Sequence, residues 1–276
     1  PDYVPPDEVS PEDDSFTIDA EYGDVVWEVP QIAGIYNVAL RIQEWRDVDG
    51  VLIKVGEVVR DMQITVESCT NQPPEIADIP DTCVVAGSFL SLLVNASDPD
   101  GDSVDLDAIG GPLSEVENPA NFSDLGAGIG QFVWSPECTE VREAPYQVVV
   151  RAEDNSGQVQ LMDLETFQIR VVAPGAEMTA AEAVGNAILL EWNPHECSGD
   201  LPSWKSAAGR YHIYRRVDSL DWTPHACETG IPDAYEFTFL GTVEGLETTA
   251  YVDDDLLSFG ATYCYRVVTE WPGSGE

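Results

Sequence analysis

The sequence predicts an all-β protein built from tandem β-sandwich domains. Short runs in which apolar and polar residues alternate recur along the 276 residues, and they are rich in Val, Ile, Tyr, Phe and Trp. Gly, Pro, Asp and Asn separate these runs at spacings that suit turns. The best candidate for a helix, 178–184, is short and lacks an apolar stripe of helical period, so sandwiches are expected throughout.

The chain is strongly acidic, with 51 Asp and Glu residues, 12 Lys and Arg residues and a formal net charge of −39. Hydrophobic residues make up 43%, enough for folded cores, and the length suggests two or three domains of about 100–150 residues each. The charge argues against nucleic acid as a partner, because Lys and Arg must neutralise its phosphates. No run of about 20 apolar residues occurs, so direct membrane insertion is not expected.

An internal repeat links the first and second parts of the chain. Three short blocks of the first part recur in the same order in the second part, with a Trp, a Tyr and a Gln at matching places. The paired blocks are 26–30 with 133–136, 36–41 with 146–151, and 60–66 with 165–171. Three matching blocks in one order indicate two copies of a single domain type.

The repeat also predicts the domain boundaries. The second copy has far more residues before Trp134 than the first copy has before Trp27. We therefore expect residues 1–70 to be the C-terminal half of a sandwich, whose other strands lie before residue 1 or come from a partner. Pro-rich boundaries then predict complete sandwiches in the segments that follow, 71–173 and 174–276.

The third domain carries an ordered set of aromatic strand motifs. Trp192 ends an L-x-W run, Tyr211 opens Y-x-I-Y-R, Tyr251 opens Y-x-D and Gly260 opens G-x-x-Y-x-Y-R-V. This order resembles the fibronectin type III family across residues 176–271. The resemblance implies that 174–276 is a fibronectin type III domain that lacks its last strand.

The middle domain has an acidic run at 96–102 and aromatic strands at 132–134 and 146–155. These residues resemble cadherin-like and immunoglobulin-like modules of bacterial surface proteins. Because the first domain repeats the second, its half-sandwich is expected to be immunoglobulin-like as well. Together the three domains resemble the long secreted proteins of the Bacteroidetes, of the kind linked with type IX secretion, gliding motility and adhesion.

These resemblances imply a structural or adhesive segment of a long extracellular surface protein or filament, with no catalysis. The expected location is extracellular or at the cell surface. Expected partners are other modules of the same longer chain, neighbouring copies in a filament, or surface glycans. The sequence contains none of the common motifs for nucleophilic, metalloprotease or phosphate-binding chemistry. The alternative is a non-catalytic accessory or carbohydrate-binding region of a secreted hydrolase.

Six widely spaced cysteines without a C-x-x-C pair predict disulfides in an oxidising compartment. Cys83 and Cys138 are expected at one pole of the middle domain, and this predicts a disulfide between them. Cys197 and Cys227 flank strands of the third domain, and we expect these two to pair as well.

Alternatives to this pairing remain open. Cys227 could pair with Cys264, and the two His-x-Cys pairs at 195–197 and 225–227 could supply four ligands for zinc. In the favoured scheme Cys69 and Cys264 are left over. Their partners are expected outside this chain.

Calcium is the sharpest candidate for a bound ion. Two expected loops and the linker bring oxygen ligands to one pole of the middle domain, and Ca²⁺ takes about six to eight oxygens. The candidate ligands are Asp98, Asp100, Asp102, Asp154, Asn71 and Glu75. Such an ion would stiffen the joint between the first two domains. The alternative is an acidic, solvated turn, because Asp-Gly and Pro-Asp form turns by themselves.

Two further pairs of residues are candidate surface sites. Trp204 and Trp222 fall in expected loops, where they could stack on a sugar or pack beneath the insertions of the third domain. Ser103 and Ser219 lie in Asp-Ser-apolar triplets. Bacteroidetes glycosylate the hydroxyl residue of such triplets, so the resemblance implies sugar on these two serines.

Overall fold

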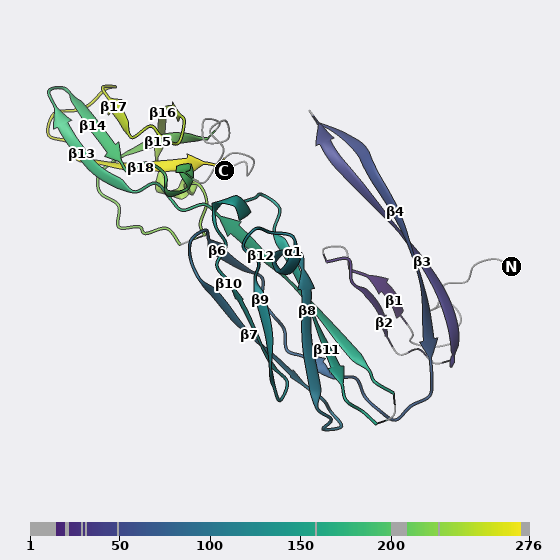
Figure 1. Cartoon of the computed structure of the whole chain (residues 1–276). Helices are drawn as coiled ribbons and strands as arrows, with labels where there is room; N and C mark the ends of the chain where they lie inside the picture. The colour runs from purple at the N-terminus through teal and green to yellow at the C-terminus, as the bar shows by residue number, and fades with distance from the viewer. Residues whose placement is uncertain are drawn as a thin grey trace. The chain divides into compact units, whose positions relative to one another are not determined.

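The computed structural model describes residues 15–19, 22–28, 30, 32–48, 50–157, 159–199, 209–225 and 227–271. The chain divides into two units, residues 1–71 and 72–276, which we describe separately. Strands dominate both units (Figure 1), and this confirms the all-β fold class. A membrane-spanning helix is not found among the described residues.

The described residues of the first unit form two antiparallel hairpins. β1 (Ser15–Ile18) pairs with β2 (Val25–Glu28), and β3 (Gly34–Val48) pairs with β4 (Val51–Val66). The ring of Trp27 connects the hairpins, because its centroid lies 6.1 Å from that of Phe16 and 4.7 Å from that of Tyr36. Val38 is the one fully buried hydrophobic residue in the described part of this unit, so its core is small.

The second unit begins with a sandwich whose described residues form two four-stranded sheets. One sheet has the order β5-β7-β10-β9 and the other β6-β12-β11-β8. The strands are β5 (Glu75–Ile76), β6 (Thr82–Val85), β7 (Leu90–Ser97), β8 (Val104–Gly110), β9 (Asn121–Gly126), β10 (Ile129–Trp134), β11 (Tyr146–Asp154) and β12 (Met162–Val172). A short helix, α1 (Gly111–Ser114), and a 3₁₀ turn, η2 (Cys138–Glu140), lie in the connections.

The core of this middle sandwich follows from the two-residue period of its strands. Along β11, Tyr146, Val148 and Val150 are buried, whereas the residues between them are more exposed. Phe132 from one sheet meets Phe167 from the other, edge to face, with 5.9 Å between centroids. Each such side chain stabilises the fold by about 1.5–3 kcal/mol through burial.

The third sandwich has two three-stranded sheets in its described part, with the orders β13-β14-β17 and β16-β15-β18. The strands are β13 (Met178–Val184), β14 (Ala187–Trp192), β15 (Arg210–Val217), β16 (Thr238–Glu244), β17 (Ala250–Asp253) and β18 (Tyr263–Glu270). The stretch considered for a helix is thus strand β13. Trp192 and Tyr211 are buried, with ring centroids 5.2 Å apart.

A buried ion pair joins the two sheets of the third sandwich. Arg215 Nη1 donates to both carboxylate oxygens of Asp253, at 3.1 and 2.9 Å. The hydroxyl of Tyr265 donates to the same carboxylate at 2.6 Å. Burial, together with the hydrogen bond to Asp253, raises the pKa of Tyr265, so the phenol remains a donor. Asp253 is 1% exposed, and these bonds satisfy its buried charge.

The strand register confirms the internal repeat. Tyr36 of β3 lies opposite Ile64 of β4, and Tyr146 of β11 lies opposite Ile169 of β12. The matching blocks therefore occupy equivalent positions in the two hairpins. In each copy the Trp and Tyr rings also meet edge to face, at an interplanar angle of 83° in both.

Candidate functional site at the joint between two sandwiches

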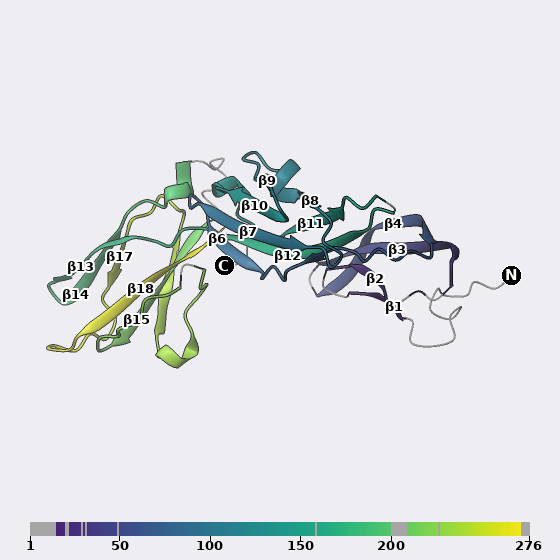
Figure 2. The same ribbon diagram turned by 90° about the horizontal axis from the view of Figure 1, so that it is seen from below.

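Two disulfides lie at the joint between the two sandwiches of the second unit. β12 ends at Val172, and residues 173–175 lead toward β13. β6 runs parallel to β12 and ends beside it, with Val85 opposite Val172. Both strands therefore end at the pole next to the third sandwich (Figures 1 and 2).

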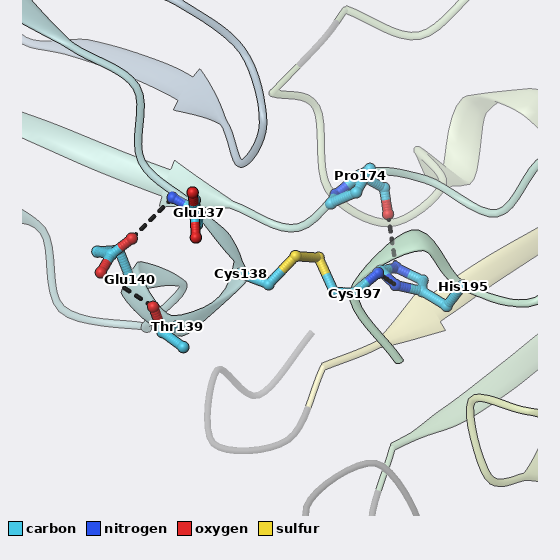
Figure 3. Close-up of a disulfide and its surroundings, with 7 residues drawn as sticks. All are labelled: Glu137, Cys138, Thr139, Glu140, Pro174, His195 and Cys197. Carbon is cyan, nitrogen blue, oxygen red and sulfur yellow. Dashed lines mark hydrogen bonds between the residues drawn. A yellow bond between two sulfur atoms is a disulfide. The ribbon is translucent and has the colours of Figure 1, made fainter. Parts of the chain in front are cut away.

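One disulfide crosses this joint between Cys138 and Cys197 (Figure 3). Cys138 begins η2 of the middle sandwich, and Cys197 lies in η3 (Glu196–Gly199) of the third. Their Cα atoms are 5.4 Å apart, within the usual span of a disulfide. Cys197 is fully buried and Cys138 is 9% exposed, so the bridge is shielded from reductants.

Buried polar groups fix the turn that carries Cys138. The backbone N–H of Glu137 donates to Glu140 Oε2 at 2.7 Å, and the hydroxyl of Thr139 donates to Oε1 at 2.9 Å. Tyr146 donates its hydroxyl to the backbone carbonyl of Glu140 at 3.0 Å. Glu140 is 2% exposed, and its carboxylate is satisfied within the turn. These hydrogen bonds hold the turn that carries Cys138 in addition to the bridge itself.

His195 holds the other side of the joint (Figure 3). The backbone N–H of Cys197 donates to His195 Nδ1 at 3.2 Å, so the network assigns the proton to Nε2, which donates to the carbonyl of Pro174 at 2.8 Å. The ring lies 5.1 Å from that of Trp271. Burial lowers the pKa of His195 and favours this neutral form. The imidazole thus ties the linker to the turn that carries the cysteine.

A second disulfide joins Cys83 in β6 to Cys227 in the insertion between β15 and β16. Their Cα atoms are 6.3 Å apart. A cavity of about 330 Å³ lies between the linker, this insertion and β18. Its lining includes Pro174, Trp222, His225 and Arg266.

Trp222 is held inside this insertion. Its ring centroid lies 4.5 Å from that of Tyr235, and the guanidinium of Arg266 lies 5.2 Å from it. Arg266 Nη2 also donates to the backbone carbonyl of Trp222 at 2.6 Å. These contacts favour packing over stacking on a ligand. Trp204 lies outside the described residues.

The expected disulfide pairing is wrong, although the same four cysteines are bridged. The structure links Cys83 with Cys227 and Cys138 with Cys197, so each bridge crosses between sandwiches. The sequence placed Cys83 and Cys138 at one pole of the middle sandwich. It did not reveal that the cysteines of the third sandwich would reach that pole. These links also exclude the zinc site and the pairing of Cys227 with Cys264. The two remaining cysteines form no disulfide in the part of the chain described.

The carboxylates predicted to bind calcium accept hydrogen bonds from nearby backbone. Asp98 Oδ1 accepts the N–H groups of Asp100 and Asp102 at 2.8 and 3.2 Å, and Asp100 accepts that of Gln72 at 2.7 Å. Asp154 is fully buried and accepts two backbone N–H groups of its loop at 3.2 Å. Across the described residues, no group of three or more His, Cys, Asp or Glu is arranged to hold a metal. Calcium binding stays a prediction.

The other predicted surface residues are dispersed. Glu75 begins β5 and is exposed, and Asn71 is the last residue of the first unit, so it is not placed relative to the aspartates. Ser103 and Ser219 are exposed. Exposure is what glycosylation requires, and the modification stays a prediction.

No family model and no curated protein sequence matches the chain. The chain is similar to solved structures of tandem repeat proteins and of an adhesin. Titin domains A168–A170 are 13% identical, with 94% of this chain and 77% of that chain covered and a TM-score of 0.30. A variant of titin domains I67–I69 is 10% identical, with 87% of this chain and 88% of that chain covered and a TM-score of 0.32. The SrpA adhesin of Streptococcus sanguinis is 14% identical, with 41% of this chain and 66% of that chain covered and a TM-score of 0.30.

Proposed function

We propose that this chain is a structural or adhesive segment of a longer extracellular surface protein, with its second unit acting as a rigid spacer. The observation that carries the proposal is the pair of disulfides across one joint. A single link between two bodies leaves them free to rotate about it. A second link at a separate point removes most of that freedom, so the two sandwiches move as one body.

The covalent chemistry supports an extracellular location. Disulfides persist in oxidising compartments and are rare in the cytosol. The large negative charge keeps such a protein soluble and disfavours its self-association. Both properties suit a segment displayed outside the cell.

The buried titratable groups support a non-catalytic role. Asp253 is neutralised by Arg215, Glu140 caps its own turn, and His195 bonds to the linker carbonyl and to a backbone N–H. Each group is already used by hydrogen bonds that hold the fold. None of these groups is therefore available to a substrate in the conformation described.

The finer parts of the proposal rest on sequence resemblance. On this basis the chain is part of a Bacteroidetes surface protein that is exported by type IX secretion. It is glycosylated at Ser103 and Ser219 and belongs to a filament. The partners on this view are other modules of the same chain, neighbouring copies or surface glycans.

The test uses the full chain exported to an oxidising compartment. Peptide mapping without reduction should recover links 83–227 and 138–197. Small-angle scattering should then show a larger radius of gyration when the bridges are reduced while the far-ultraviolet spectrum is retained. If the radius of gyration does not change on reduction, the disulfides do not hold the two sandwiches as a rigid spacer and the proposal is wrong.

The alternative function is a carbohydrate-binding or accessory region of a secreted hydrolase. The cavity beside Trp222 is where a sugar would stack. Trp222→Ala should lower stability by about 2 kcal/mol, because it removes packing against Tyr235, and should leave glycan binding unchanged. The exposed Trp45→Ala is the matched control for stability. Glycan-array binding that is lost in Trp222→Ala and kept in the control would favour the alternative.

A further inference from the structure

The first unit presents an apolar sheet face that is half covered. On one face of β3, Val38 is 2% exposed, yet Ile42 four residues further on is 59% exposed. The repeat places Val148 and Ala152 at the equivalent positions of β11, and both are fully buried. The same face is therefore closed in the second copy and open in the first.

One part of this difference is a neighbouring strand. In the middle sandwich β11 pairs with β12 on one side and with β8 on the other. In the described part of the first unit, β3 pairs with β4 and forms a two-stranded sheet with it. Val104 and Leu106 of β8 are 5% and 6% exposed, so β8 supplies core residues as well as backbone hydrogen bonds. A long strand edge of this kind is a template for another strand.

Charge complementarity identifies what the edge would accept. Arg151 of β11 reaches Asp107 of β8, with 3.6 Å between Nη2 and the carboxylate oxygen. The equivalent residue of β3 is Arg41, whose side chain is 67% exposed and whose nearest carboxylate, that of Glu57, is 3.9 Å away. Arg41 is thus placed to meet an acidic residue on an added strand.

The β3–β4 hairpin is also nearly neutral in a very acidic chain. Residues 34–66 hold four Lys and Arg residues and five Asp and Glu residues, a net charge of −1, whereas the whole chain carries −39. Repulsion of an acidic strand is consequently weaker at this hairpin than the net charge of the whole chain would suggest. The chain's other acidic strands, such as β8, have the composition that would dock there.

We infer that the open edge of β3 binds one β-strand of the longer polypeptide, antiparallel to Val38–Glu44, in the place that β8 takes on β11. The strand carries apolar residues opposite Leu40 and Ile42 and an acidic residue opposite Arg41. Its source rests on the proposed function, which makes this chain part of a longer protein. The spacer role is tested at the joint of the second unit and strand binding is tested at β3, so either proposal can fail without the other.

The test tethers a copy of residues 102–112, which contain β8, in front of the full chain through a Gly/Ser linker. Tethering gives a millimolar effective concentration, so binding does not depend on high intrinsic affinity. Hydrogen exchange of the amides at 38–44 should slow by about tenfold or more relative to the chain without the tether. Unchanged exchange, or equal slowing by a tether of the same residues in shuffled order, would overturn the inference.

Two pairs of variants sharpen this test. Ile42→Ser should remove the protection, whereas Ile35→Ser, at a residue 64% exposed on the opposite face of β3, should keep it. Arg41→Glu should weaken the protection, and Asp107→Lys in the tethered copy should restore it. Failure of that charge swap would refute the docking register. If amides 38–44 are already protected without a tether, and more so at higher protein concentration, a second copy covers the edge and the inference is wrong.

Discussion

Pulling the chain from its two ends should show how much of the second unit the disulfides prevent from extending. The link between Cys83 and Cys227 spans 144 residues. An extended chain covers about 3.5 Å per residue, so this bridge hides about 500 Å of contour length from the pulling force. The second link lies inside the first and hides no further length while the first is intact.

A graded series follows from this nesting. In Cys83→Ala/Cys227→Ala the remaining link spans 59 residues, which hides about 200 Å. Full reduction should hide nothing. The hidden length should therefore fall from about 500 Å to about 200 Å and then to zero.

Single-molecule force spectroscopy on the full chain measures these lengths directly. The pairing expected from sequence, Cys83 with Cys138 and Cys197 with Cys227, would instead hide about 300 Å in the intact protein. Under that pairing, loss of Cys227 would release about 100 Å. Cys69→Ser, at an exposed cysteine outside both bridges, is the control and should change nothing. A hidden length near 300 Å would refute the crossed arrangement.

Three further predictions concern stability. Arg215→Ala should lower the free energy of unfolding in urea by about 3–5 kcal/mol, because it leaves the buried carboxylate of Asp253 without its charged partner. Arg151→Ala, which breaks an exposed ion pair, should lower it by less than about 1 kcal/mol. Equal losses in the two variants would contradict this prediction. The lowered pKa of His195 means that the unfolded chain takes up the proton first, so stability is complete above about pH 6.5 and declines below it. His195→Gln should flatten that decline, and an unchanged pH profile would count against it. If the predicted ligands bind calcium, millimolar calcium should raise the melting midpoint of the chain above its value in chelator. The double variant Asp98→Asn with Asp102→Asn should abolish this rise. If the unsubstituted chain shows no rise, the prediction of a calcium site is wrong.

Much of the fold could be predicted from the sequence, because local patterns carry it. The matching Trp, Tyr and Gln blocks predicted two copies of one domain type, and Tyr36 and Tyr146 occupy the same register in their hairpins. The alternating runs predicted strands, and in β11 the same two-residue period decides which side chains face inward.

The joint could not be predicted in the same way. Pairing of the cysteines depends on which pole of one sandwich meets the next, and this is a long-range property that no strand pattern encodes. The local spacing of His195 to Cys197 suggested zinc binding only as an alternative to the disulfide. The true partner of His195, the carbonyl of Pro174, is a backbone atom 21 residues away.

Residual dipolar couplings of the full chain, fitted separately for the middle and third sandwiches, test the central claim most directly. With both bridges intact, one alignment tensor should describe the two sandwiches, and after reduction the two tensors should diverge. Two different tensors in the oxidised protein would contradict a rigid, disulfide-clamped spacer.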